Sequence, residues 1–216
     1  MKVFWHKNGD NKQLLLLFNG WGFDWKTFRK VDIPHHDVAS VYDYTDVEPE
    51  QFEFTKLYAE VKVVAWSYGV FIADFYSNCI SNVTKAIAIN GSTTPVDNSK
   101  GIPLATFLAT MKSFNAENRI KFYLRIAGGL SAYKRIADNL PDRDAENQLA
   151  ELKSLYKLSQ EDRQNGLDWS IAIVSTQDKI FPLVNMKNAW GNKAVTVEGE
   201  HYPDFETMIN SALLNK

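Results

Sequence analysis

The chain has a single cysteine, Cys79, among 216 residues, so it cannot close a disulfide within itself and does not depend on an oxidising compartment. It also lacks a long apolar run, since the longest, Leu14–Phe18, is far too short to span a bilayer. The opening residues Met1–His6 carry no apolar segment after a basic start, which argues against a signal peptide. We therefore expect a cytoplasmic protein without a membrane partner.

Neither sign of charge dominates. Twenty-four basic and 26 acidic residues give a net charge of −2, which provides no electrostatic footprint for nucleic acid. Histidine is scarce as well, with four in the chain. Adjacent residues such as His35 and His36 seldom point at one ion, and no third ligand is evident, so we expect no metal site. Apolar residues make up 45% and charged residues 23%, the balance of an ordinary soluble globular protein with a substantial core.

Short apolar segments alternate with helix-like stretches, a pattern that predicts an α/β protein with a mostly parallel sheet. We expect each segment to be a strand buried on both faces, because apolar residues run through it without alternation. Val3–Trp5 is predicted to add an edge strand. The six main segments are Gln13–Phe18, Val38–Tyr42, Val61–Trp66, Ala86–Asn90, Ser170–Ser175 and Ala194–Glu198.

The alternation stops after Asn90, and from about Pro95 to Asp162 apolar residues recur at helical spacing. A helical insertion in such a sheet usually covers the edge where ligands bind. We expect residues 1–216 to form one domain with a helical cap insertion at about 95–165, since the cap is too small to bury its apolar faces alone. The predicted cap helices are Leu104–Phe114, Glu117–Ile126, Ala132–Asn139 and Ala145–Leu158.

A strand runs directly into Ser67, and a helix follows it without a polar loop. Such a tight turn needs small residues two positions before and two after the serine, where Ala65 and Gly69 stand. This is the nucleophile elbow G-x-S-x-G with alanine in the first position, which predicts Ser67 as a nucleophile at the carboxyl edge of the sheet. The alternative is that Ser67 only caps the helix that follows it.

An elbow serine needs an acid and a histidine after later strands, in that chain order. Asp178 follows the strand that ends near Ser175, and His201 follows the strand that ends near Glu198. Taken alone, Asp178 is equally a turn residue and His201 a surface histidine. Their joint placement predicts a catalytic triad, with Asp204 as the fallback acid if it does not cap the last helix instead.

The oxyanion hole of an elbow hydrolase uses the N–H of the residue after the nucleophile and an N–H from the loop after an earlier strand. Tyr68 supplies the first. Trp21 is the candidate for the second, because Gly20 and Gly22 flank it and let the backbone turn inward. A plain glycine turn after a strand is the alternative.

Four motifs together resemble the α/β-hydrolase superfamily: Leu17–Gly22, Ala65–Gly69, Gln177–Pro182 and Gly199–Pro203. Within it, the short chain, the Asn-Gly-Trp-Gly loop and the Trp-Ser-Tyr-Gly-Val elbow are similar to the small pimeloyl-[acyl-carrier protein] methyl ester esterases of biotin synthesis. Many superfamily members have His-Gly where this chain has Asn19-Gly20, and Gly in place of Ala65. Neither difference removes a catalytic group.

The resemblance implies a serine carboxylesterase that releases methanol from pimeloyl-carrier protein methyl ester without a metal or organic cofactor. It implies an acyl carrier protein as partner, and the cap offers a basic stretch for that acidic protein: Lys112–Arg135 sums to +5. We expect Arg119, Lys121 and Arg125 to dock the carrier, unless they form an ordinary solvated face. Aromatic residues of the cap either line an acyl channel or pack the cap onto the sheet, namely Phe107, Phe114, Phe122, Tyr123 and Tyr133.

Two other functions fit the same residues. A general carboxylesterase or an acyl thioesterase would use the same fold and triad. A non-catalytic relative that only binds a ligand would more often have lost the serine or the histidine. The sequence leaves the oligomeric state undetermined.

Overall fold

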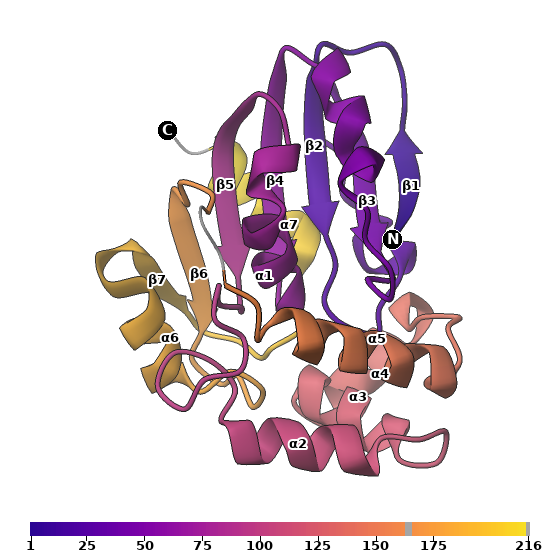
Figure 1. The fold of residues 1–216 in the computed structure, drawn as a ribbon, viewed down its shortest axis with the longest axis vertical. Coiled ribbons are helices and arrows are strands. Elements are labelled where there is room, and N and C mark those ends of the chain that lie inside the picture. The colour runs from indigo at the N-terminus through magenta and orange to yellow at the C-terminus, as the bar shows by residue number, and fades with distance from the viewer. Residues whose placement is uncertain (163–165, 215–216) are drawn as a thin grey trace.

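The computed structural model describes residues 1–162 and 166–214. Within them, seven strands form one sheet in the order β1-β3-β2-β4-β5-β6-β7 (Figure 1). β1 pairs with β3 antiparallel, and all other neighbours are parallel. The strands are β1 (Lys2–Lys7), β2 (Gln13–Phe18), β3 (His36–Tyr42), β4 (Glu60–Trp66), β5 (Val83–Ile89), β6 (Ile171–Ser175) and β7 (Ala194–Val197).

Helices lie on both faces of the sheet. In Figure 1, α1 (Tyr68–Phe75) lies in front of the central strands and α7 (Phe205–Leu214) behind them, while α6 (Leu183–Trp190) lies beside β6 and β7. No described helix combines the length and the hydropathy that crossing a bilayer requires. Short 3-10 turns connect the elements at Trp25–Phe28, Pro49–Leu57, Ser77–Cys79, Ala137–Asn139 and Gly191–Lys193.

The core runs along the central strands. Leu14–Phe18 of β2 are completely buried, as a strand between two parallel neighbours and two helical layers must be. At about 1.5–3 kcal/mol for each large apolar side chain removed from water, this strand alone contributes strongly to the driving force for folding. The same register brings the carboxyl ends together, because Phe18 pairs with Ala65 and Ser175 with Val197.

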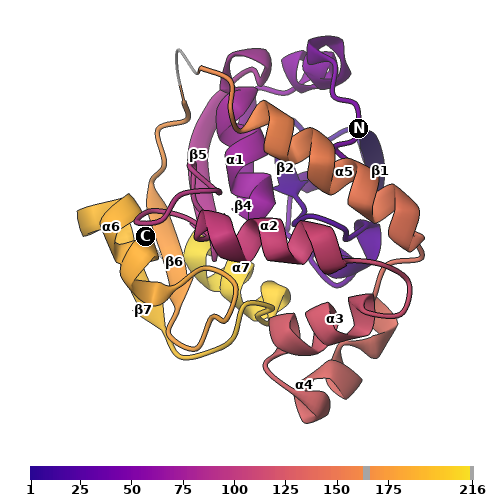
Figure 2. The same cartoon turned by 60° about the horizontal axis from the view of Figure 1, so that its bottom comes forward.

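The cap consists of four helices between β5 and β6: α2 (Leu104–Ser113), α3 (Arg119–Ala127), α4 (Leu130–Arg135) and α5 (Ala145–Leu158). They lie across the carboxyl ends of the strands, as Figures 1 and 2 show from two directions. The predicted helical insertion is therefore present at the predicted edge. Its predicted end at residue 165 lies outside the described residues, and the interpretation of the chain as one domain stays a prediction.

Two details of the sequence prediction are wrong. Ala194–Val197 is not buried on both faces: Val195 is 45% exposed, because β7 is the last strand of the sheet and has a neighbour on one side only. The predicted helix Ala132–Asn139 instead begins at Leu130 and gives way to a 3-10 turn after Arg135. The left-handed backbone of Gly128 ends α3, so α4 starts directly after Gly129.

Candidate active site

The backbone at Ser67 has the strained conformation that an elbow requires, with φ 57° and ψ −126° between β4 and α1. The turn is possible because Gly69 has no side chain. A Cβ at this position would lie 2.4 Å from the carbonyl oxygen of Asn19 and 2.6 Å from that of Phe18. The end of β2 thus passes directly against the start of α1, and both border the serine.

Three side chains from three separate strand ends form one hydrogen-bonded chain. His201 Nε2 lies 2.9 Å from Ser67 Oγ, and His201 Nδ1 lies 2.7 Å from Asp178 Oδ2. His201 is 1% exposed and the Asp178 side chain is completely buried. Because the buried carboxylate accepts a hydrogen bond from Nδ1–H, Nε2 is left with a lone pair that faces the hydroxyl group.

Asp178 is itself held by the backbone. Its Oδ1 accepts hydrogen bonds from the N–H groups of Ile180 at 2.7 Å and Phe181 at 3.0 Å, which leaves Oδ2 for the histidine. Asp204 makes no such contact with His201. It accepts from the N–H and the hydroxyl group of Thr207 and so caps the start of α7.

The loop that carries His201 is fixed by two buried side chains that the sequence analysis did not single out. Trp66 Nε1 donates to the carbonyl oxygen of His201 at 2.9 Å, and Asn90 Nδ2 donates to the same oxygen at 3.0 Å and to Glu200 O at 3.1 Å. Asn90 also accepts from the N–H of Ser175. The signal that could have found it is the Asn90-Gly91 pair, because Asn90 is the last residue of the predicted strand Ala86–Asn90 and so stands at the same edge.

The two predicted oxyanion donors border the same space. Tyr68 is the first residue of α1, so its N–H has no acceptor within the helix. The N–H of Trp21 has no backbone acceptor among residues 1–162 and 166–214. Trp21, Ser67 and Tyr68 all line one pocket beneath the cap.

That pocket is narrow and mostly apolar, with a free volume of about 30 Å³. Phe107 and Phe122 of the cap line it, so two of the predicted channel aromatics reach the site. Others support its wall: Phe114 packs edge-on against the ring of Trp21, and Tyr123 is buried behind them. The remaining lining residues are Trp66, Ile102, Thr106, Thr110, Arg125, Ile126, Leu152, Ile180 and His201.

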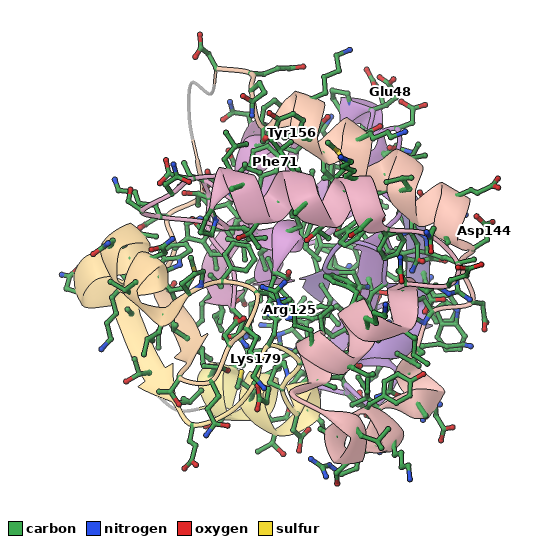
Figure 3. The ribbon with its side chains drawn as sticks, turned by 90° about the horizontal axis from the view of Figure 1, so that it is seen from below. Glu48, Phe71, Arg125, Asp144, Tyr156 and Lys179 are labelled. Carbon is green, nitrogen blue, oxygen red and sulfur yellow. The ribbon has the colours of Figure 1, made fainter. Side chains whose placement is uncertain are left out.

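The predicted basic residues of the cap differ in their surroundings. Arg125 is exposed, borders the pocket and donates from Nε to the carbonyl oxygen of Lys179 at 2.8 Å. Figure 3, seen from below, shows Arg125 and Lys179 beside each other in front of the strand ends. Lys121 is exposed one turn earlier on α3, whereas Arg119 is half-buried and donates to Arg143 O. Lys179 was not predicted from the sequence.

No cluster of three potential metal ligands occurs in the described parts of the chain. His35 and His36 do not act together: His36 Nδ1 donates to Pro34 O, and its Nε2 faces Lys62 Nζ at 3.0 Å. His35 adopts a positive φ of 62°, which turns the chain at this point.

Comparison with known proteins gives a family for this geometry. The family model for "Pimeloyl-ACP methyl esterase BioG" matches residues 1–209. The crystal structure of BioG from Haemophilus influenzae is similar to the present structure with a TM-score of 0.85 and 32% sequence identity, over 94% of each chain. The family match extends across the strand ends and the cap alike.

Two further likenesses are more limited. A malonyl-[acyl-carrier protein] O-methyltransferase of Bacteroides fragilis is 33% identical over 199 residues, which are 89% of this chain but 40% of that protein. A lipase-esterase related protein from Clostridium acetobutylicum has a TM-score of 0.63 at 14% identity, over 99% of this chain and 98% of that one. Together with the sheet order, these structural neighbours show the α/β-hydrolase fold.

Proposed function

Because the chain belongs to the pimeloyl-ACP methyl esterase BioG family of biotin synthesis, we propose that Ser67, His201 and Asp178 carry out its ester hydrolysis. The observation that carries the proposal is the continuous hydrogen-bonded chain from Asp178 Oδ2 through the imidazole to Ser67 Oγ, with contacts of 2.7 and 2.9 Å. In the sequence, His201 lies 23 residues from Asp178 and 134 residues from Ser67. Packing of the strand ends, and not local sequence, holds them in line.

In the first half of the reaction, Ser67 Oγ attacks the carbonyl carbon of the methyl ester while His201 Nε2 takes the hydroxyl proton. The carbonyl π electrons move to oxygen, where the N–H groups of Trp21 and Tyr68 stabilise the negative charge. The carbon–methoxy bond then breaks, and His201 returns its proton to the leaving methanol. An acyl-Ser67 ester remains.

In the second half, a water molecule enters and His201 removes its proton as it attacks the acyl carbon. The bond to Ser67 Oγ breaks, the serine regains a proton from His201, and the carboxylate product departs. Asp178 stabilises the imidazolium form in both halves, because its carboxylate accepts from Nδ1. None of these steps requires a metal or an organic cofactor.

The basic mouth of the pocket supports an acyl carrier protein as the partner that delivers the substrate. Arg125 and Lys179 are exposed side by side here, and Arg125 also borders the pocket. Lys121 is exposed one turn earlier on α3. Arg119 adds to the local field, although its guanidinium is engaged with Arg143 O. The Bacteroides relative is named as an O-methyltransferase of malonyl-[acyl-carrier protein], which is a carrier of this kind. An acidic carrier would be steered to this mouth by charge.

The pocket must widen to take the acyl chain. Its free volume of about 30 Å³ is small beside the roughly 300–1,000 Å³ of typical ligand pockets. We infer that side chains of α2 and α3, including Phe107 and Phe122, move aside as the substrate enters.

The direct test is Ser67→Ala, assayed for methanol release from pimeloyl-carrier protein methyl ester with product mass measured. Turnover should fall by roughly four or more orders of magnitude while the unfolding midpoint stays near that of the wild type. A fluorophosphonate probe should label the wild type at Ser67 alone. Labelling that persists in the Ala variant would place the nucleophile elsewhere.

A further inference from the structure

The loop that carries the proposed oxyanion donor Trp21 is hydrogen-bonded to cap helix α5. Trp21 Nε1 donates to the carbonyl oxygen of Gln148 at 2.6 Å. The Gln148 side chain donates from Nε2 to the carbonyl oxygen of Gly22 at 2.7 Å. Glu151 Oε2 accepts from the N–H of Gly22 at 2.9 Å. Both backbone polar groups of Gly22, the residue that follows Trp21, are thus engaged by one helix that lies more than a hundred residues away in the sequence.

These two side chains are the polar members of a buried stripe on α5. Gln148, Glu151, Leu152 and Leu155 recur at helical spacing, and each is at most 1% exposed. A helix that only needed to pack would bury apolar residues at all four positions, since an amide and a carboxylate are costly to remove from water. Their presence here is explained by the loop groups that they bind.

Glu151 also reaches beyond the loop. Its Oε1 accepts from the N–H of Tyr44 at 2.8 Å, and Oε2 accepts from Arg143 Nη1 at 2.7 Å. Arg143 in turn donates from Nη1 to Phe23 O and from Nη2 to Asp43 Oδ1. Burial raises the pKa of the Glu151 carboxyl, whereas Arg143 and the two N–H donors favour its charged form. The result is a buried ionic cluster that joins the cap, the loop and the region after β3.

We propose that Gln148 and Glu151 are positioning residues for the oxyanion hole, because they lock the Gly20–Phe23 loop in the conformation that presents the Trp21 N–H to the pocket. The proposal rests on the proposed function of Ser67 and deepens it. It makes the cap part of the catalytic machinery and not only a cover over the substrate.

The physical reason lies in how a backbone donor is aimed. Gly22 has a φ of 78°, which is freely accessible to glycine, so the loop by itself has several conformations within reach. An oxyanion donor contributes only when it is already directed at the charge that develops in the transition state. Hydrogen bonds to both the N–H and the C=O of Gly22 fix the peptides on either side of it, which removes that freedom before the substrate arrives.

The test uses two nearly isosteric variants, Gln148→Met and Glu151→Met, with p-nitrophenyl butyrate as substrate. The first removes the donor to Gly22 O and to the Tyr123 hydroxyl group, and the second removes the acceptor of the Gly22 N–H. In each variant, kcat should fall roughly 10- to 100-fold, because the Trp21 N–H is no longer held toward the developing oxyanion. KM should stay within about twofold of the wild-type value. Affinity for a trifluoromethyl ketone, which forms an oxyanion adduct with the serine, should fall by a similar factor.

The matched control is Leu155→Ala, which truncates an equally buried side chain on the same helix without touching the loop. After correction for the folded fraction by denaturant titration, its kcat should equal that of the wild type. A wild-type kcat in a folded Gln148 or Glu151 variant overturns the assignment of that residue. An equal fall of kcat in Leu155→Ala overturns the positioning role, because general loosening of α5 would then suffice.

These outcomes are separable from failure of the proposed function. If Ser67→Ala retains activity, the site itself is misassigned. If Ser67→Ala is inactive while Gln148→Met and Glu151→Met turn over like the wild type, the site stands and only the role of α5 is refuted.

Discussion

Asp178→Asn should inactivate the esterase by forcing His201 into the wrong tautomer. In the wild type, Oδ1 of Asp178 accepts two backbone N–H groups, from Ile180 and Phe181, while Oδ2 faces His201 Nδ1 at 2.7 Å. An asparagine side chain has one oxygen and one NH₂ group. Because two N–H donors face the first position, the amide oxygen must occupy it, since an NH₂ group there would meet donors only.

The amide NH₂ group is thereby directed at His201 Nδ1. This nitrogen must then accept a hydrogen bond, so the ring proton moves to Nε2, the nitrogen 2.9 Å from Ser67 Oγ. A protonated Nε2 cannot take the hydroxyl proton. The expected loss in kcat is on the order of 10⁴, which corresponds to about 5 kcal/mol of transition-state stabilisation.

The assay is kcat for p-nitrophenyl butyrate and for pimeloyl-carrier protein methyl ester, with the unfolding midpoint measured in parallel. The matched control is Asp204→Asn, because that carboxylate lies three residues from His201 but accepts hydrogen bonds from Thr207. It should retain kcat within about twofold and a near wild-type unfolding midpoint, because asparagine caps a helix about as well as aspartate. The reasoning is refuted if Asp178→Asn loses less than about tenfold, or if Asp204→Asn is the inactive variant.

Three further outcomes are expected. Lys121→Glu should raise KM for the carrier-bound ester and barely affect p-nitrophenyl butyrate, because Lys121 is exposed and does not line the pocket. Added salt should act in the same way as the Debye length falls from about 10 Å at 0.1 M to about 3 Å at 1 M, and equal effects on both substrates would remove the docking role. Arg143→Met should lower the unfolding free energy in denaturant titration by about 3–5 kcal/mol, because it leaves the buried Glu151 without its cationic partner. Adding Glu151→Gln should recover part of that loss, and a loss below about 1 kcal/mol would contradict this. Burial lowers the pKa of His6 from 6.5 to about 4, so the unfolded chain takes up a proton on this residue before the native state does, and stability should fall as pH drops from about 6.5 toward 4. His6→Gln should flatten that part of the curve of denaturant midpoint against pH, and an unchanged slope would show that other groups cause it.

The strand and helix boundaries near the site could be predicted because they follow from local patterns. β2 and α5 have the predicted bounds, since the apolar run Leu14–Phe18 and the helical spacing in Ala145–Leu158 each leave a clear signal. The Ser67 elbow is likewise local: the strand, the serine and Gly69 stand within a few residues of each other. The expected exposure of β7 was wrong because apolar composition does not reveal which strand ends a sheet.

The strand–serine–helix elbow, the two motifs that follow later strands and the helical insertion can all be read from the sequence, because each of them is a local pattern of residues. That Asp178 and not Asp204 faces His201, and that Gln148 and Glu151 bind the Trp21 loop, follows from the packing of the folded chain. These contacts join residues up to 129 positions apart, and their partners are largely backbone N–H and C=O groups, which every residue carries. A side chain that binds a generic backbone group leaves no complementary residue elsewhere in the sequence, so its partner is defined only when the packed strands and cap bring the two together.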